Sequence, residues 1–442
     1  MKRNFRTIVM LSLATLISAA MSFGQGPAPY RLTLREAVQR ALENNVNVLT
    51  AWTQVDETEG IRTRYKSALL PHVVAETYAN LQRISLDAFG LTGLAVVALP
   101  EATGPFSNYD FHIGAQQNLV DLQSYRQWKA SQHIVDAAKL GYEGACDLVI
   151  LAVADLYLKS QSAVARIDAA QSRVTDSDAL YRLAKDKHDA GTATGVDVLR
   201  AQVQLANDKQ GLLVAQNQYK QSLLALARNL GMSPGTPLEL ADPLRFRPLP
   251  ELQAERLVPS ALLARPDYLA LASQRQALVE QQRANRARYY PKFSIFGGYG
   301  ELGRNLGDFQ RVGIVQAQID ITVFDRDRSG EAQQLASQLN RIDYQIADLR
   351  RGIEEEIRQA LLNIGSTAEQ VAVAKEGKDL AQRELELAQD RFQSGMTNNV
   401  EVVTAQDQLA RAQENYILAV SSHTDAKFGL AAALAETKTI GE

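Results

Sequence analysis

Apolar and polar residues alternate in four short segments of this chain, with the period of two that is typical of a strand with one dry and one wet face. The clearest is VGIVQAQIDITVFD, and a similar segment surrounds residue 115, with Gln117 as an exception. The polar positions, which we expect to face water in a lumen, are Gln316, Gln318, Asp320, Thr322, His112, Gln116 and Asn118. Each segment is about ten residues long, the length of a transmembrane barrel strand. We therefore expect four transmembrane strands, within 72–121 and 292–325.

Two much longer segments, 122–189 and 328–393, have helical periodicity instead. In the second, apolar residues follow the alternating four-three spacing of a coiled-coil seam, with a stutter at Ile357 that should straighten the supercoil. The seam consists of Leu335, Leu339, Ile342, Ile346, Leu349, Ile353, Ile357, Ala360 and Ile364. At 1.5 Å per residue, each helix would be about 100 Å long.

The two long helices end in related sequences. A shift of 204 residues places Gly191 on Gly395 and the following VDVLRAQVQLA on VEVVTAQDQLA. Each glycine has the position of a helix C-cap, and a returning helix follows within a few residues. The pattern predicts two helical hairpins, 122–230 and 328–436.

The duplication extends upstream. Thr33 and Glu36 have capping-box spacing and open a helix to about Leu70, with a break at Asn44-Asn45, and its counterpart is expected from Ser260 to Tyr290. A proline ends each helix, and a shift of 220 residues superimposes the two prolines. The first copy therefore carries 16 extra residues, which we assign to the loop 83–107. The predicted parts are two repeats, about 33–230 and 255–436, joined by a proline- and glycine-rich linker at 231–258.

The N-terminal sequence indicates that the protein is exported. Residues 1–24 have a basic start, an apolar run and then small residues, the pattern of a cleaved secretory signal peptide. The run is shorter than a membrane span requires, which argues against a retained anchor. Removing Lys2, Arg3 and Arg6 changes the formal net charge from −3 to −6, so the mature chain has no electrostatic footprint for nucleic acid. The one cysteine, Cys146, excludes an internal disulfide framework.

Membrane insertion should use the strands, because we find no helix-length apolar run after residue 24. Four strands cannot close alone, and open edges leave backbone groups unpaired in hydrocarbon. Two copies would give eight strands, whose side chains nearly fill the interior, whereas three copies would give twelve strands and a lumen. The expected fold is therefore mainly α with a small β part, assembled as a homotrimer that contacts outer-membrane lipid.

Several motifs in this order resemble the TolC-type outer-membrane efflux proteins over essentially the whole mature length. They are LTLREAVQRALENN, the strand exits NLVDLQSYRQWKAS and TVFDRDRSGEAQQ, and the paired G-x4-V-[DE]-V-x2-AQ-x-QL turns at 191 and 395. The resemblance implies a homotrimeric channel with a twelve-stranded barrel in the outer membrane and an α-helical barrel across the periplasm. It also implies docking to a periplasmic adaptor of an efflux pump or type I secretion system, and through the adaptor to an inner-membrane pump.

Candidate pore residues follow the two tip glycines. Asp197 and Glu401 occupy equivalent positions, three residues after the potential N-caps Thr194 and Asn398, and one interpretation is that both act only on helix ends. Alternatively, Glu401 from three subunits would form an acidic ring that favours cations. The resemblance supports an acid at Glu401. Some family members carry a second acid one turn later, where this chain has Thr404, and a basic residue where it has Thr397.

The tip turns are the expected contacts of the adaptor, although short connections require glycine in any case. The candidates are Gly191, Thr192, Gly195, Gly395, Met396 and Thr397.

The sequence gives little support to a nucleotide-binding, calcium-binding or catalytic site. The G-x-G-x-x-G match at Gly298 is not followed by a helix, and the calcium-loop start at Asp325 has Ala336 at its twelfth position. We expect no cofactor, no metal and no catalysis. The expected function is passive export through an outer-membrane exit duct, for small molecules or proteins. The alternative is a periplasmic coiled-coil scaffold or adaptor without a pore.

Overall fold

The computed structural model describes residues 30–90, 100–250 and 252–440. The expected signal peptide, residues 1–24, lies outside these residues, as does the middle of the loop 83–107. The described chain is mainly α with a small β part, which confirms the fold class at this level. It divides into two compact units, and three helices contribute to both.

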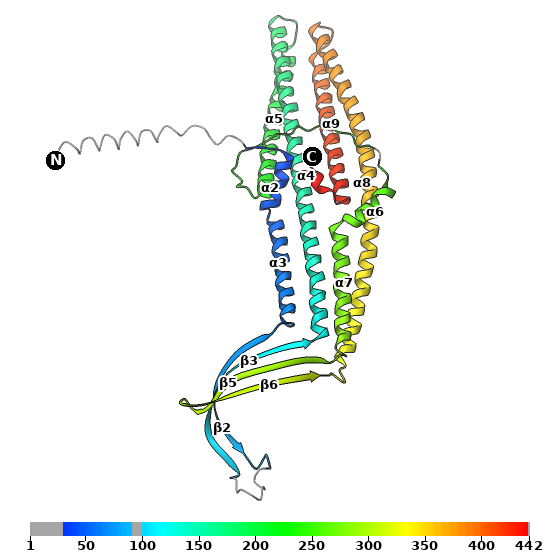
Figure 1. Cartoon of the computed structure of the whole chain (residues 1–442). Coiled ribbons are helices and arrows are strands. Elements are labelled where there is room, and N and C mark those ends of the chain that lie inside the picture. Colours follow the sequence, from blue (N-terminus) through cyan, green and yellow to red (C-terminus); the bar gives the residue numbers. More distant parts are fainter. Residues whose placement is uncertain (1–29, 91–99, 251, 441–442) are drawn as a thin grey trace, which may run out of the picture. The chain divides into compact units, whose positions relative to one another are not determined.

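Of the described residues, unit 1 contains those within 30–50, 144–264 and 352–440. Its elements are β1 (Tyr30–Leu32), α2 (Leu34–Asn44), the later part of α4 (Leu122–Asp189), α5 (Gly195–Asn229), β4 (Leu238–Leu240), α6 (Ala254–Ala264), the later part of α8 (Asp327–Gln393), α9 (Asn399–Ala433) and the 3-10 helix η1 (Thr437–Thr439). Two helical hairpins, α4/α5 and α8/α9, dominate this unit (Figure 1).

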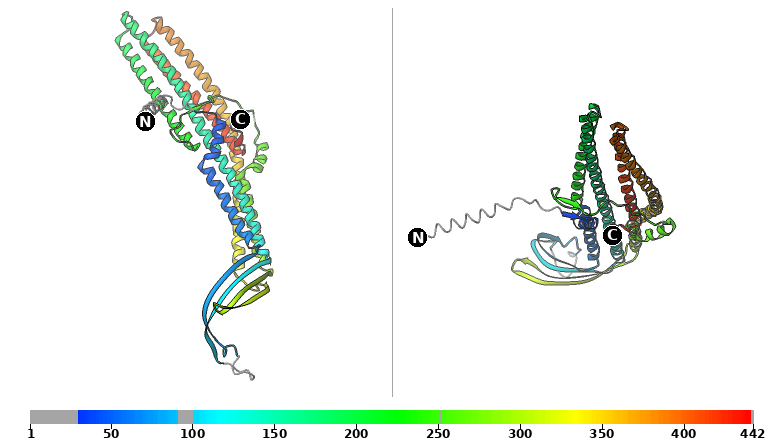
Figure 2. Two further views of the ribbon diagram at one scale, coloured as in Figure 1. Left: turned by 60° about the vertical axis from the view of Figure 1, so that its left-hand side comes forward. Right: turned by 90° about the horizontal axis from the view of Figure 1, so that it is seen from above.

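Unit 2 contains residues 51–143 and 265–351. Its elements are most of α3 (Val46–Ser67), β2 (His72–Ser85), β3 (Ala102–Val120), the first part of α4, α7 (Pro266–Ala287), β5 (Lys292–Asn305), β6 (Asp308–Asp320) and the first part of α8. The four strands form one antiparallel sheet in the order β2-β3-β5-β6, and Figure 2 shows it as a curved sheet.

The strands are longer than the roughly ten residues expected, at 14, 19, 14 and 13 residues. Strand pairing continues beyond the segments in which apolar and polar residues alternate, because backbone hydrogen bonding does not require an alternating pattern. Conversely, β6 ends at Asp320, so Thr322 lies beyond the strand, which corrects its placement on the strand. Gln117 pairs with Ile295 and therefore lies on the mainly apolar face.

The helix of the second copy is not continuous from Ser260 to Tyr290. It is divided into α6 and α7 at Arg265, which is extended because it precedes Pro266 (φ −67°, ψ 119°). In the first copy the helix breaks at Asn45, as expected, and the Thr33–Glu36 capping box is present. The Asn45 side chain donates to the carbonyl oxygen of Asn229 at 2.9 Å.

A small parallel sheet of β1 and β4 was not expected from the sequence, because strands of three residues carry no readable period. It places a short strand within the linker. Beneath it, the Tyr157 hydroxyl is 2.9 Å from both the Leu32 carbonyl and an Asp242 carboxylate oxygen. Burial of the ring, together with Asp242, raises the pKa of Tyr157.

The seam residues of α8 are buried or half-buried, and Ile353 and Ile357 are fully covered. Within the described residues one helix, α4, contains an 18-residue stretch apolar enough to cross a membrane, with half of the stretch buried. This corrects the expectation that no such stretch follows residue 24. Its buried members include Ile150, Val153 and Tyr157, so it serves as a core helix of the bundle.

Candidate functional site

The tips of the two hairpins have the predicted C-caps. Gly191 and Gly395 have positive φ angles of 75° and 72°. The amide of Thr192 donates to the carbonyl of Lys187 (2.8 Å), and that of Met396 donates to the carbonyl of Arg391 (2.9 Å). Because only glycine adopts this conformation without strain, each tip turns sharply into its returning helix.

The two returning helices begin differently, although their sequences are related. Thr194 and Asp197 form a capping box in which one Asp197 carboxylate oxygen accepts from the Thr194 amide (3.1 Å) and hydroxyl (2.6 Å). At α9 the Asn398 side chain caps the amide of Val400 instead (3.0 Å). Glu401 is therefore not used in capping. Its side chain is 39% exposed, against 14% for Asp197.

Glu401 has one cationic neighbour among the described residues. The Nε of Arg391 lies 3.5 Å from a Glu401 carboxylate oxygen, and both side chains are substantially exposed. Such a pair contributes about 0–1 kcal/mol, so it does not lock the carboxylate in place. Thr404 is exposed one turn further along α9, where its hydroxyl donates back to the Val400 carbonyl (2.8 Å).

Contacts that the sequence analysis missed join the two tips. The fully buried Asn399 donates from Nδ2 to the Asp197 carbonyl (2.6 Å), and its Oδ1 accepts from Arg200 (2.8 Å). Lys187 donates to the carbonyls of Phe392 (2.8 Å) and Gln393 (3.1 Å) at the end of α8. The duplication contained a hint of these contacts. Under the shift of 204, Arg200 and Lys187 align with different residues, Thr404 and Arg391.

An apolar cluster lies beneath these contacts and includes residues from all four helices of the hairpins. Its buried members are Leu180, Ala184, Ala201, Ala381, Leu385, Ala388, Phe392, Val402, Ala405 and Leu409. The five alanines allow the helices to approach closely. The tips of one chain are thus packed together as well as hydrogen-bonded.

Replacing Asn399 by alanine is expected to loosen the tips. The change leaves the Asp197 carbonyl and Arg200 without their partner at a buried position, which costs about 1–3 kcal/mol. Hydrogen exchange at the amides of 187–200 and 391–402 should become faster. Asn363→Ala, at an exposed site on α8, is the matched control. Equal exchange in the two variants would show that Asn399 does not hold the tips.

The strand residues predicted to face a lumen share one face of the sheet. The register pairs Gln116 with Phe296 and Phe296 with Gln316, and it pairs Asn118 with Ser294 and Ser294 with Gln318. Directly paired residues point to the same side of a sheet. This face is not uniformly polar, because Phe296 belongs to it.

His112 has two acidic neighbours on this face. Its Nδ1 lies 2.9 Å from an Asp110 carboxylate oxygen, and its Nε2 lies 3.6 Å from a Glu76 carboxylate oxygen. Lys292 and Asp320 are paired at the helix end of the face, where Lys292 also lies 3.6 Å from Asp121. Among the residues that the structure describes, no group of three or more His, Cys, Asp or Glu side chains has a geometry that would hold a metal ion.

Four strands with one polar and one apolar face, continued by two long helical hairpins, are the fold of solved outer-membrane channels. The outer-membrane channel CmeC of Campylobacter jejuni superimposes with a TM-score of 0.78 at 15% identity, covering 94% of this chain and 90% of CmeC. The outer membrane protein VceC of Vibrio cholerae superimposes with a TM-score of 0.77 at 16% identity, covering 91% of this chain and 95% of VceC.

Sequence comparison identifies the family. The family described as outer membrane efflux protein matches residues 37–232 and 257–436, and the chain belongs to it. The pyoverdine export outer membrane protein OpmQ of Pseudomonas aeruginosa is 25% identical over 419 residues, which are 91% of this chain and 84% of OpmQ. The toluene efflux pump outer membrane protein TtgF of Pseudomonas putida is 24% identical over 393 residues, or 87% of this chain and 79% of TtgF.

Proposed function

We propose that this protein is the exit duct of a tripartite efflux pump. It would form a homotrimeric channel that spans the outer membrane and extends into the periplasm, after a signal peptide has been cleaved. Solutes would pass from the periplasmic side to the exterior without catalysis, and inner-membrane partners would supply the energy. The observation that carries the proposal is the strand register, which collects polar side chains on one face and leaves apolar side chains exposed on the other.

The sheet supports a closed wall made by several copies. β2 and β6 are its edges, and within the described residues each pairs along one side only. The apolar face is highly exposed, with Val73, Ile113, Val315 and Ile319 as examples. In hydrocarbon, such a face is stable only if the edges are paired. Three sheets joined edge to edge would give twelve strands around a water-filled lumen.

The hairpins support the same assembly. In Figure 1, α5 and α8 form the outer sides of the paired hairpins of unit 1, and each carries exposed apolar residues at helical spacing. These are Val196, Leu199, Val203, Leu213, Val214 and Leu224 on α5, and Leu362, Val373, Leu380 and Leu387 on α8. Contact between α5 of one copy and α8 of the next would cover both stripes.

A native mass measurement in detergent tests the assembly. The proposal requires three chains, and a monomer that retains its membrane sheet would exclude it. Membrane fractionation separates the channel from the alternative of a periplasmic scaffold without a pore, which would remain in the soluble periplasmic fraction.

The relatives favour an efflux pump over a type I secretion system, because their names describe toluene efflux and pyoverdine export. The proposed adaptor contacts are the tip residues Gly191, Thr192, Gly195, Gly395, Met396 and Thr397. Thr192 and Met396 are exposed and suit site-specific crosslinking. Copurification of the crosslinked assembly should recover a periplasmic adaptor and an inner-membrane pump. Absence of tip crosslinks in an assembled pump would reject these contacts.

At the pore mouth we propose Glu401 as the selective residue, with Thr404 beside it on α9. Asp197 is a weaker candidate, because its carboxylate is held in the capping box. A ring of three Glu401 carboxylates would attract cations.

Glu401→Gln is expected to lower cation selectivity, and Arg391→Gln to raise it, since the latter removes the nearby positive charge. Reversal potentials of single channels in a salt gradient measure both effects. Unchanged selectivity in both variants would eliminate the ring.

A further inference from the structure

The junction between α3 and β2 carries three cations that no acid neutralises. Arg62 is half-buried, Arg64 and Lys66 are exposed, and none of them has an ion pair among the residues that the structure describes. Between residues 60 and 72 the sequence contains no Asp or Glu. Two acids of the neighbouring elements are already engaged: Glu59 lies 3.3 Å from Lys139, and Asp121 accepts from Ser124 and lies 3.6 Å from Lys292.

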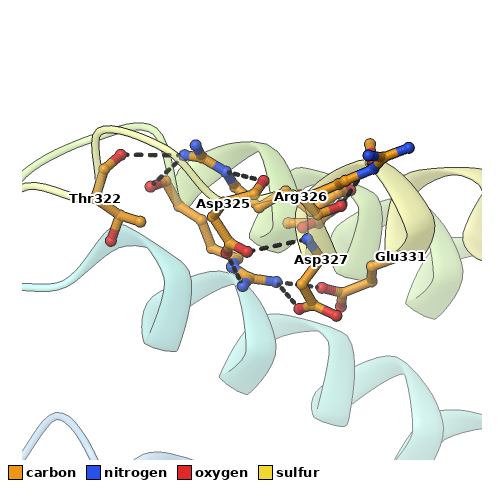
Figure 3. A network of polar contacts seen from close by, with 9 residues as sticks. Thr322, Asp325, Arg326, Asp327 and Glu331 are labelled. Carbon is orange, nitrogen blue, oxygen red and sulfur yellow. Dashed lines mark hydrogen bonds and ion pairs between the residues drawn. The ribbon is translucent and has the colours of Figure 1, made fainter.

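At the corresponding junction of the second copy, between α7 and β5, Arg288 is neutralised by three acids. Arg288 donates to Asp325, to Asp327 at 3.0 Å and to Glu331 at 2.7 Å. Figure 3 labels these three acids, which lie close together at the start of α8. Arg328 lies 3.9 Å from the centre of the Tyr289 ring and donates to the Arg288 carbonyl (3.2 Å). Arg288 and Arg328 therefore hold the chain where the strands meet the helices.

The duplication explains why the first copy differs. Under the shift of 204, Asp325 corresponds to Asp121, but Asp327 and Glu331 correspond to Gln123 and Gln127. Under the shift of 220, Arg288 corresponds to Ala68. The first copy thus lacks the buttressing arginine together with two of the three acids. Within the described residues, its own cations Arg62, Arg64 and Lys66 have no ion pair.

The surroundings of the three cations are partly apolar. The Asn118 side chain donates to the Ala68 carbonyl (3.4 Å), which places the end of α3 beside the exit of β3. Tyr65 and Leu70 are exposed near the end of α3, and Leu119 and Val120 are exposed at the end of β3. They continue the exposed side chains of the strands toward the helices. Aromatic and basic residues together are typical of a protein surface at the level of lipid headgroups.

We propose that the end of α3, with Arg62, Arg64 and Lys66 as its charged residues, binds the headgroup of an anionic phospholipid. The lipid would belong to the leaflet on the helix side of the membrane. The phosphate would lie against the three cations and the acyl chains along the apolar strand face. The proposal rests on the proposed function, because it requires the strands to span a membrane.

A structural explanation accounts for only part of the pattern. Cations in the last turn of a helix interact favourably with its dipole, which suits Arg64 and Lys66. The dipole effect falls off beyond that turn, so it does not explain Arg62. Nor does it explain the loss of the two acids at the neighbouring start of α4.

Native mass spectrometry of the full assembly, titrated with phosphatidylglycerol or phosphatidylethanolamine, tests the proposal. Arg62→Gln/Arg64→Gln/Lys66→Gln is expected to weaken phosphatidylglycerol binding roughly 10- to 100-fold, because each cation near a membrane surface contributes to anion attraction. Phosphatidylethanolamine binding should not change. Lys209→Gln/Lys220→Gln/Lys375→Gln removes three exposed cations from the hairpins of unit 1 and should leave both affinities unchanged. Arg62→Lys/Arg64→Lys/Lys66→Arg keeps the charge and should retain binding.

Two results would overturn the lipid site. One is wild-type phosphatidylglycerol affinity in the triple glutamine variant. The other is an equal loss of affinity in the variant of the unit 1 hairpins. A lower melting temperature with unchanged lipid affinity would assign the cations to the helix dipole alone. If the wild-type protein is absent from the membrane fraction, the proposed function fails. An inserted protein without preference for phosphatidylglycerol rejects only the lipid site.

Discussion

An arginine in place of Val315 is expected to prevent the protein from assembling in the outer membrane. Val315 is 85% exposed and lies on the apolar face of β6, paired with Gly297. A lipid-facing arginine near the bilayer midplane costs about 2–4 kcal/mol. The proposed trimer would carry three of them. The amount of heat-resistant oligomer in purified outer membranes measures the effect.

Gln316→Arg is the matched control for this experiment. Gln316 is the next residue along β6 and points to the opposite face, where it pairs with Phe296. An arginine there would face water and should be tolerated. If Gln316→Arg also blocks assembly, or Val315→Arg does not, the assignment of the two faces is wrong.

Gly300→Ala is expected to disrupt the centre of the sheet. A Cβ at this position would lie 2.5 Å from the Cβ of His112 and 2.7 Å from its Cα, and would also collide with the Phe111 carbonyl oxygen. These atoms belong to the paired strand β3. The backbone of β3 cannot move aside at low energetic cost. We expect the free energy of unfolding to fall by about 1–3 kcal/mol per subunit. Loss of the folded oligomer at lower temperature, followed by gel electrophoresis, measures this.

Gly297→Ala distinguishes this steric effect from a general cost of replacing strand glycines. A Cβ at Gly297 would meet no atom within 4 Å, and the residue lies in the same strand. Its alanine variant should have wild-type thermal stability. Equal destabilisation by the two substitutions would contradict the close approach of β3 and β5 at Gly300.

Local sequence patterns predicted the tips well and their connection poorly. The capping residues Thr194 and Asn398 and the C-cap glycines Gly191 and Gly395 are confirmed, since a cap depends on residues within one turn. The role of Asn399 was invisible, because its partners Asp197 and Arg200 are about 200 positions away in the sequence.

Segments that are related by the duplication also form different side-chain contacts. Asp197 and Glu401 are equivalent under the duplication, yet one closes a capping box and the other remains half-exposed. The difference lies in the residue three positions earlier: the Thr194 hydroxyl accepts from the Asp197 amide, whereas the Asn398 carboxamide oxygen accepts from the Val400 amide, one residue nearer. The two helix–strand junctions are likewise related by the duplication and differ in their side-chain contacts.

The sequence by itself determined the class of structure: four strands with alternating faces, two long hairpins, their caps and the duplication that relates them. These follow from periodicity and from neighbours a few residues apart. Only the tertiary structure decided which acid is left exposed at the tips, how far the strands extend and which cations have no partner. Those properties depend on side chains that folding brings together from distant parts of the chain, and no local pattern records them.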